Sequence, residues 1–330
     1  MNVPITVVIP LVAHLLMSLV MFGLPNMTRR EILFGVVVPT DFRSSPEGRK
    51  AIHEFRLAIL ISAVAGAMAI VLLGSRFIPL FLLAPGIMML AGFTTFVLQN
   101  RKLRAFAVQP QPLRELELSA SSERLPWFVW LGLVPLLLLV TAALYLHAHW
   151  DSIPSRYPVH WGLDGNPNRW ADRSFRGVYA PLFFGAELII WFFGFALAIW
   201  YGSRRSEPLR RPMVGYVVAA EWTLALTLAG VALGPVVHLP FAAVAVGGVP
   251  IIVVSIIYLI KKSNDPRTPV DPTPNECWKG GMIYYNPNDA ALFVARRDGI
   301  GLTSNMGNPW SWVMLASLPV LIAIGFLVLP

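Results

Sequence analysis

Apolar residues occur along the chain in eight long runs, separated by shorter polar segments. A helix needs about 20 predominantly apolar residues to cross the hydrocarbon core of a bilayer. Each run reaches or approaches that length, so the pattern predicts an all-α polytopic membrane protein with about eight transmembrane helices. The runs are roughly 4–24, 57–74, 77–98, 126–146, 178–200, 214–234, 238–260 and 310–328.

Composition supports a membrane protein and argues against other common classes. Only 13% of the 330 residues are charged, whereas a soluble domain has about 25%. The net charge of +8 does not indicate nucleic-acid binding, because the basic residues are not gathered in one domain. Cys277 is the single cysteine, which excludes an intramolecular disulfide. The first run has no basic leader and no clear cleavage site, so we expect a retained span and no signal peptide.

The positions of Lys and Arg predict the orientation in the membrane. Four segments, 25–56, 99–125, 201–213 and 261–309, together hold 21 of the 26 basic residues. The segments on the other side of the spans hold only five. Because cytoplasmic loops carry the excess of Lys and Arg, we expect the four basic segments in the cytoplasm and both termini outside it.

A small cytoplasmic β module is predicted before the last span. It follows a polar linker and consists of a β-hairpin or meander, with strands near 281–286, 291–297 and 300–305. Turns are predicted at 286–289 and 298–299, where Asn-Pro and Asp-Gly pairs occur.

The expected domain organisation follows these segments. One further apolar piece, 32–39, is too short to span and is expected to be interfacial, re-entrant or a short strand under the bundle. The predicted domains are 1–125, with three spans and this piece; 126–200, with two spans around a motif loop at 147–176; 201–260, with two spans; 261–309, with the linker and β module; and 310–330, the last span.

The motif loop holds the densest group of ionisable and aromatic residues in the chain. Its Pro, Gly and Asn residues predict ordered turns between 153 and 170, and neither helix nor strand. We expect His160 to lie near Asp164 and Asp172, where a protonated imidazole can pair with a carboxylate. The candidate ligand-binding residues are His160, Trp161, Asp164, Gly165, Asn166 and Trp170.

This loop carries a resemblance to a known family. Pro158, His160, Gly165, Pro167 and Trp170, just after a span, resemble the conserved loop of a domain of unknown function in bacterial membrane proteins. SdpI-type immunity proteins against peptide toxins belong to that group. The resemblance implies a multi-pass protein of the bacterial cytoplasmic (inner) membrane with the loop outside.

The β module carries a second resemblance. Its sequence from Trp278 to Asp289 is similar to the WKGGxxYYNPxD pattern of another small domain of unknown function. The two domains occur together in predicted membrane proteins, which implies one shared architecture. The module residues that carry the resemblance and are candidate functional positions are Gly281, Tyr285, Asn286 and Asp289.

Two acidic residues fall inside predicted spans, Glu187 in the fifth and Glu221 in the sixth. Intramembrane charges are costly, so such residues are functional candidates by default. They could form a proton or cation path, or a structural pair with polar partners in the bundle. His14, in the first span, is expected to be a packed and hydrogen-bonded core residue.

No pattern in the chain indicates an enzyme, a cofactor or a metal. His147, His149, Asp151 and His160 have the residue types of a zinc site, but their spacing matches no known metal motif. Hydrogen bonding that folds the loop is the simpler interpretation. We therefore predict no catalytic residues, no metal and no cofactor.

Two functional hypotheses follow. In the first, the protein binds or senses an extracytoplasmic ligand, or gives immunity to one such as an antimicrobial peptide, by resemblance to the SdpI-type proteins. Its partners would be the lipid bilayer, a peptide or small-molecule ligand outside and a cytoplasmic protein, but no nucleic acid. In the second, the protein is a secondary transporter coupled through Glu187 and Glu221.

Overall fold

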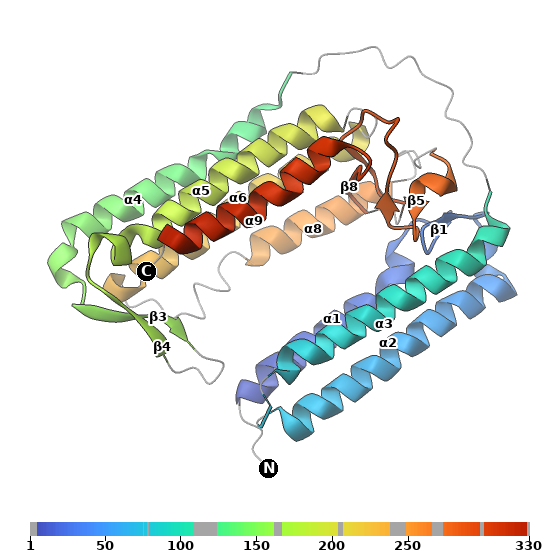
Figure 1. Ribbon diagram of the computed structural model, residues 1–330, viewed down its shortest axis with the longest axis horizontal. Helices are drawn as coiled ribbons and strands as arrows, with labels where there is room; N and C mark the ends of the chain where they lie inside the picture. Colours follow the sequence, from blue (N-terminus) through green and yellow to red (C-terminus); the bar gives the residue numbers. More distant parts are fainter. Residues whose placement is uncertain are drawn as a thin grey trace.

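The computed structural model describes residues 5–74, 76–77, 79–108, 124–161, 167–203, 207–237, 249–265, 273–297 and 300–328. Most of them are helical (Figure 1). Within the described ranges, six helical segments are long and apolar enough to cross a membrane, by length and composition. The predicted all-α membrane architecture is therefore confirmed. The helices are α1 (Ile5–Met27), α2 (Pro46–Leu73), α3 (Leu80–Leu103), α4 (Val134–Ala148), α5 (Phe175–Gly202), α6 (Glu207–Val237), α8 (Val249–Ser263) and α9 (Pro309–Val328).

The eight helices form two groups that run roughly along one axis (Figure 1). Helix α2 packs against α1 and α3 in the first group, and α6 packs against α4, α5 and α8 in the second, with α9 on α5. Two of the helices, α2 and α5, begin at a serine that caps them. The Ser45 and Ser174 hydroxyls accept hydrogen bonds from the third following backbone N–H, at Gly48 and Gly177, both 3.0 Å. Large apolar side chains cover the outer helix faces, as expected for contact with lipid.

Short antiparallel hairpins lie at the two ends of the helix groups (Figure 1). One end carries the pair β3 and β4, and the start of α1 and the end of α9 lie toward it. The opposite end carries three further hairpins. The strands are β1 (Ile32–Leu33), β2 (Val36–Val37), β3 (Arg156–Trp161), β4 (Pro167–Asp172), β5 (Trp278–Lys279), β6 (Ile283–Tyr284), β7 (Phe293–Ala295) and β8 (Leu302–Ser304).

Of the three alternatives expected for 32–39, the structure shows short strands, which form the β1–β2 hairpin at the end of the first helix group. Phe34 and Gly35 form its turn with positive φ angles of 48° and 72°. The Phe34 ring packs against Phe55 of α2 and Phe96 of α3, with centroids 5.2 and 5.5 Å away. The hairpin therefore covers the end of the first helix group.

The β module lies before the last helix, as predicted, but its strands differ from the predicted ones. It forms two separate hairpins, β5–β6 and β7–β8, where a strand over 281–286 was expected. Gly280 and Gly281 have φ angles of 62° and 77°, so they turn the chain and pair Trp278–Lys279 with Ile283–Tyr284. The turn at 286–289 is confirmed, whereas 298–299 lies outside the described residues.

The module packs on the helix ends. The Leu292 N–H donates to the Gly202 carbonyl of α5 (3.1 Å), and the Gly301 N–H donates to Ser263 of α8 (3.0 Å). Arg104, just beyond α3, donates to the Trp278 carbonyl at 3.2 Å. The module therefore touches both helix groups.

Candidate functional site

The motif loop is a β-hairpin, which corrects the expectation of turns without strands. Arg156 pairs with Asp172, and Tyr157 pairs with Ala171. Tyr157 and Ala171 are buried, whereas Arg156, Trp170 and Asp172 beside them on the two strands are exposed. A register shift follows Pro158, which has no N–H for a ladder bond. Proline and turn residues concealed the two strands in the sequence.

The base of the β3–β4 hairpin is fixed to the helices. Ile153, Tyr157 and Ala171 belong to one core cluster with residues of α4, α5 and α6. The Arg173 guanidinium donates to three backbone carbonyls at 3.2 to 3.3 Å, those of Trp150, Asp151 and Ile153. This places the strands on a rigid support.

Burial also affects the one titratable group at this base whose pKa departs clearly from its usual value. Apolar packing raises the pKa of the Tyr157 phenol from 10.0 to about 12. The phenol therefore remains neutral over the whole physiological range and acts as part of the core.

The outer face of the hairpin displays charged and aromatic groups. Trp170 is 47% exposed, and the Arg156 guanidinium lies over its ring, 5.8 Å from the centroid. Arg156 and Asp172 are opposite one another across the strands. A guanidinium over an exposed indole forms a flat, amphipathic surface.

The remaining candidate loop residues are only partly described. His160 and Trp161 belong to β3, and their backbones pair with Arg169 and Pro167 of β4. Asp164, Gly165 and Asn166 lie outside the described residues, as does the expected approach of His160 to Asp164.

The histidines before the hairpin have local contacts. The His149 ring stacks on Tyr145 at 4.1 Å, and its Nδ1 lies 2.9 Å from the Tyr145 carbonyl. Among the described residues, no group of three His, Cys, Asp or Glu side chains could hold a metal ion.

The two intramembrane acids differ in their surroundings. Glu187 on α5 is half-buried, whereas Glu221 on α6 is completely buried. Neither carboxyl oxygen of Glu221 has a hydrogen-bond partner within the described ranges. The structure thus singles out Glu221 of the predicted pair. His14 is buried with Nε2 3.0 Å from the Ala63 carbonyl, as expected of a core histidine.

The candidate residues of the β module are mostly engaged in folding it. Asp289 accepts from the Tyr284 hydroxyl at 2.8 Å, and the Asn286 side chain contacts that hydroxyl at 3.2 Å. Gly281 has a positive φ and packs on Asn100. Tyr285 is 47% exposed and is the member of this set that faces outward.

Asn305, a residue that sequence reasoning did not select as a site, organises this network. It is completely buried, and its Nδ2 donates to the carbonyls of Asn286 and Asp289, both at 2.9 Å. Its Oδ1 accepts from the Asn286 and Gly307 N–H groups, both at 3.0 Å. The Asn305 side chain thus links the β5–β6 and β7–β8 hairpins by hydrogen bonds.

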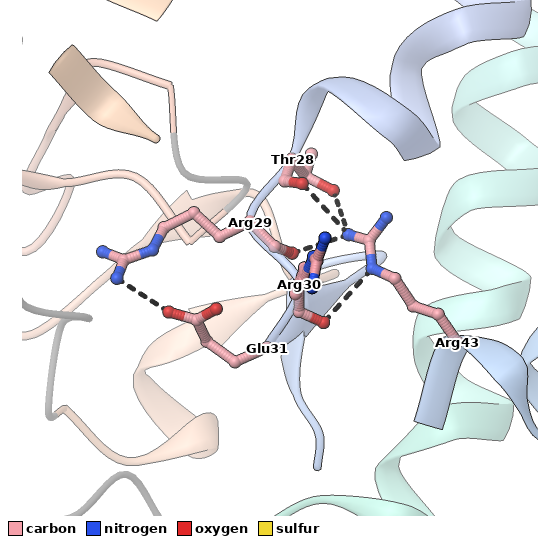
Figure 2. Close-up of polar contacts among 5 residues, drawn as sticks. All are labelled: Thr28, Arg29, Arg30, Glu31 and Arg43. Atoms are coloured by element: carbon pink, nitrogen blue, oxygen red, sulfur yellow. Dashed lines mark hydrogen bonds and ion pairs between the residues drawn. The ribbon is translucent and has the colours of Figure 1, made fainter. Parts of the chain in front are cut away.

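Arg43 is the second structural residue that sequence reasoning missed. Figure 2 shows its guanidinium turned toward the chain that leaves α1. Helix ends leave carbonyls without intrahelical partners, and this side chain satisfies several at once. Burial lowers the pKa of Arg43 below its usual 12.5, although Glu31 acts to raise it. The hydrogen-bonded oxygens belong to Pro25, Thr28, Arg29, Arg30 and Ile32.

Comparison with known proteins locates two similar segments. A model described as "Domain of unknown function (DUF1648)" matches residues 137–185, from α4 through the β3–β4 hairpin into α5. A model described as "Family of unknown function (DUF5808)" matches residues 287–312, in the β module and the start of α9. The first domain is found in SdpI-type proteins, so the resemblance of the loop is confirmed at the level of the domain. No curated protein and no solved structure matches the chain.

Proposed function

We propose that this membrane protein binds a ligand at the membrane surface through the outer face of the β3–β4 hairpin. The observation that carries the proposal is the exposed Trp170 with Arg156 over its ring, on a hairpin whose base is pinned by Arg173. Trp and Arg are the residue types that contribute most to binding at protein interfaces. A rigid support lowers the entropy cost of ordering the surface on binding.

The ligand class follows from the chemistry of that face. Indole offers apolar contact area, while the guanidinium of Arg156 suits a carboxylate or a backbone carbonyl. A peptide at the membrane surface, such as an antimicrobial peptide, has both kinds of group. The domain shared with SdpI-type proteins supports an immunity or sensing role of this kind.

The orientation belongs to the same proposal. The described parts of the four basic segments lie at the module end, opposite β3–β4 (Figure 1). By the excess of Lys and Arg in cytoplasmic loops, the hairpin and both termini face outward from a bacterial cytoplasmic membrane. The module, with Tyr285 exposed, then faces a cytoplasmic protein partner.

A tolerance assay tests the binding role. Bacteria that express the protein are exposed to a panel of membrane-active peptides, and the inhibitory concentration of each is measured. We expect increased tolerance to at least one peptide, lost in Trp170→Ala and retained in Trp127→Ala, which removes a 74% exposed Trp at the other end of the protein. Equal tolerance in Trp170→Ala and the parent would refute the role of this face.

Thiol labelling tests the orientation separately. With Cys277 replaced by Ser, Asn168→Cys on β4 should react with an impermeant reagent in intact cells. The native Cys277 should react only after lysis. The reverse pattern would place the hairpin in the cytoplasm and exclude an extracytoplasmic ligand.

Secondary transport through Glu187 and Glu221 is a second candidate. It is favoured by one observation, the completely buried Glu221 carboxyl without a partner among the described residues. A proton gradient imposed on liposomes with the reconstituted protein should then dissipate faster than in empty liposomes. Dissipation at the same rate would exclude proton-coupled transport under those conditions.

A further inference from the structure

Glu221 lies in the middle of α6 with apolar residues above and below it. Its carboxyl group has 0% exposure, and neither oxygen has a hydrogen-bond partner within the described ranges. The neighbours on the same helix face, three and four residues away, offer no donor. They are Val217, Val218, Leu224 and Ala225.

The carboxyl packs directly on a glycine of another segment. Gly132 closes the 3-10 helix η3 (Trp127–Gly132), which precedes α4. A Cβ added at Gly132 would lie 2.1 Å from Oε2 of Glu221, so only glycine leaves room for the acid here. The Glu221 carboxyl therefore occupies the space that a side chain at position 132 would fill.

The residue beside Glu221 fixes the same segment. Pro135 has no N–H to offer the Leu131 carbonyl four residues earlier. The Trp222 indole N–H donates to that carbonyl instead, at 3.1 Å. Two consecutive residues of α6 thus hold η3, one by a hydrogen bond and one by close packing.

No charged group on the packed elements compensates a carboxylate at this position. The described elements against α6 are η3, α4, α5, α8 and β8. Neither η3 nor β8 has a titratable residue, and no hydrogen bond or ion pair joins Glu221 to those on the other elements or on α6 itself. These are Tyr145 and His147 on α4; Arg176, Tyr179, Glu187 and Tyr201 on α5; Tyr258, Lys261 and Lys262 on α8; and Glu207, Arg210, Arg211 and Tyr216 on α6.

We propose that Glu221 is a proton-binding site, loaded while η3 packs on α6 and emptied when the two separate. An unpaired carboxylate in an apolar interior is far more costly than the neutral acid. The packed arrangement therefore holds the protonated form, and the proton leaves only when Glu221 reaches water or a new donor. The ligand is a proton because a metal cation requires several ligands, and the described residues place no group of three His, Cys, Asp or Glu side chains together.

This site is independent of ligand binding by the hairpin and shares only Glu221 with the transport candidate. It also assigns different roles to the two acids. Glu187 is half-buried, and the three atoms nearest a Cβ at Gly132 all belong to Glu221. A test can therefore use Glu187 as the matched control on a neighbouring span.

Infrared spectroscopy of the protein in lipid nanodiscs at neutral pH tests the site directly. A protonated carboxylic acid has a carbonyl stretch that carboxylates and amides lack. We expect such a band in the parent, its loss in Glu221→Gln, and its retention in Glu187→Gln. A parent spectrum without the band, or an unchanged band in Glu221→Gln, would overturn the proposal.

A pair of substitutions tests the contact with η3. Gly132→Ala should lower the unfolding temperature and weaken or shift the acid band, because its Cβ displaces the carboxyl. In a Glu221→Ala background the same change should lower the unfolding temperature much less. Gly194→Ala on α5, with nothing within 4 Å of the added Cβ, is the control. An equal loss in both backgrounds would show that Glu221 does not occupy this place.

Proton flux distinguishes this site from the transport candidate. Flux that is present in the parent and absent in Glu221→Gln, together with loss of the acid band, supports both. If the acid band is present in the parent and lost in Glu221→Gln, but the parent shows no proton flux, the proton site is supported and transport is contradicted. A missing acid band overturns the site whatever the flux.

Discussion

The two ends of this protein use short hairpins in opposite ways. At the module end, backbone turns and a side-chain amide are buried. The turn at Gly35 packs on the turn at Gly281. The Asn305 amide forms hydrogen bonds to backbone groups of Asn286, Asp289 and Gly307. At the other end, β3–β4 buries only its base and exposes Trp170 and Arg156. Both regions overlap segments that match domains of unknown function.

The hairpins at the two ends differ in how far their side chains take part in the fold. At the module end, Asn286 and Asp289 form hydrogen bonds with other residues of the module. On β4, about half of the Trp170 side chain stays exposed, as the proposed binding role requires. Substitutions should therefore damage stability at one end and binding at the other.

The largest effect is expected where the turn of the β1–β2 hairpin contacts the turn of the β5–β6 hairpin. Gly35 has a φ of +72°, and a Cβ there would lie 2.2 Å from the Gly281 carbonyl oxygen. Gly35→Ala should lower the free energy of unfolding by about 3 kcal/mol or more, through strain and overlap together. Thermal unfolding in detergent measures this. Gly86→Ala on α3, which meets nothing within 4 Å, should be neutral or stabilising. Similar losses for both would show that the hairpins are not in contact.

The second effect concerns Asn305. Asn305→Ala leaves buried N–H and C=O groups without partners, so we expect a loss of about 2–3 kcal/mol. Asn288→Ala removes an exposed amide two residues from Asn286 and should cost less than about 0.5 kcal/mol. Denaturation curves of the two variants give the comparison. Equal stability would mean that the module does not depend on its central amide.

A smaller and pH-dependent effect is expected at the base of β3–β4. Because burial raises the pKa of Tyr157 to about 12, its contribution is fully present below pH 10 and is lost as the pH rises toward 12. The loss should be on the order of 1–2 kcal/mol. Unfolding temperatures measured across this window should fall more steeply in the parent than in Tyr157→Phe. Tyr285→Phe, an exposed phenol at the module end, should retain the steep fall. Parallel curves for Tyr157→Phe and the parent would disprove the assignment.

The smallest effect on stability is expected at the displayed face. Trp170→Ala should change the free energy of unfolding by less than about 0.5 kcal/mol, as is usual for surface positions. Circular dichroism melts of the purified variant can establish this. A loss above 2 kcal/mol would show that Trp170 is part of the fold, and the contrast between the two ends would disappear.

Local sequence signals predicted the helices well because each span is a continuous apolar run. A short strand at 32–39 was one of three alternatives that local rules left open. What local rules missed depends on distant residues. The buried face of β3–β4 exists only because Tyr157 meets the core of α4–α6. The Glu221 carboxyl packs on Gly132 of a distant segment, and the Asn305 side chain bonds to the distant Asn286.

The apposition of Gly35 and Gly281 has a consequence for the order of assembly. Helices α1 to α3 leave the ribosome long before residue 281, and domains synthesised first generally fold first. The Asn100 side chain already holds the Phe34 carbonyl at 2.8 Å, so the β1–β2 turn can form early with one side uncovered. Its cover, the turn at Gly281, is synthesised only after α8. Because contacts between distant parts of a chain form slowly, the joint between the two helix groups closes as a late step of biogenesis.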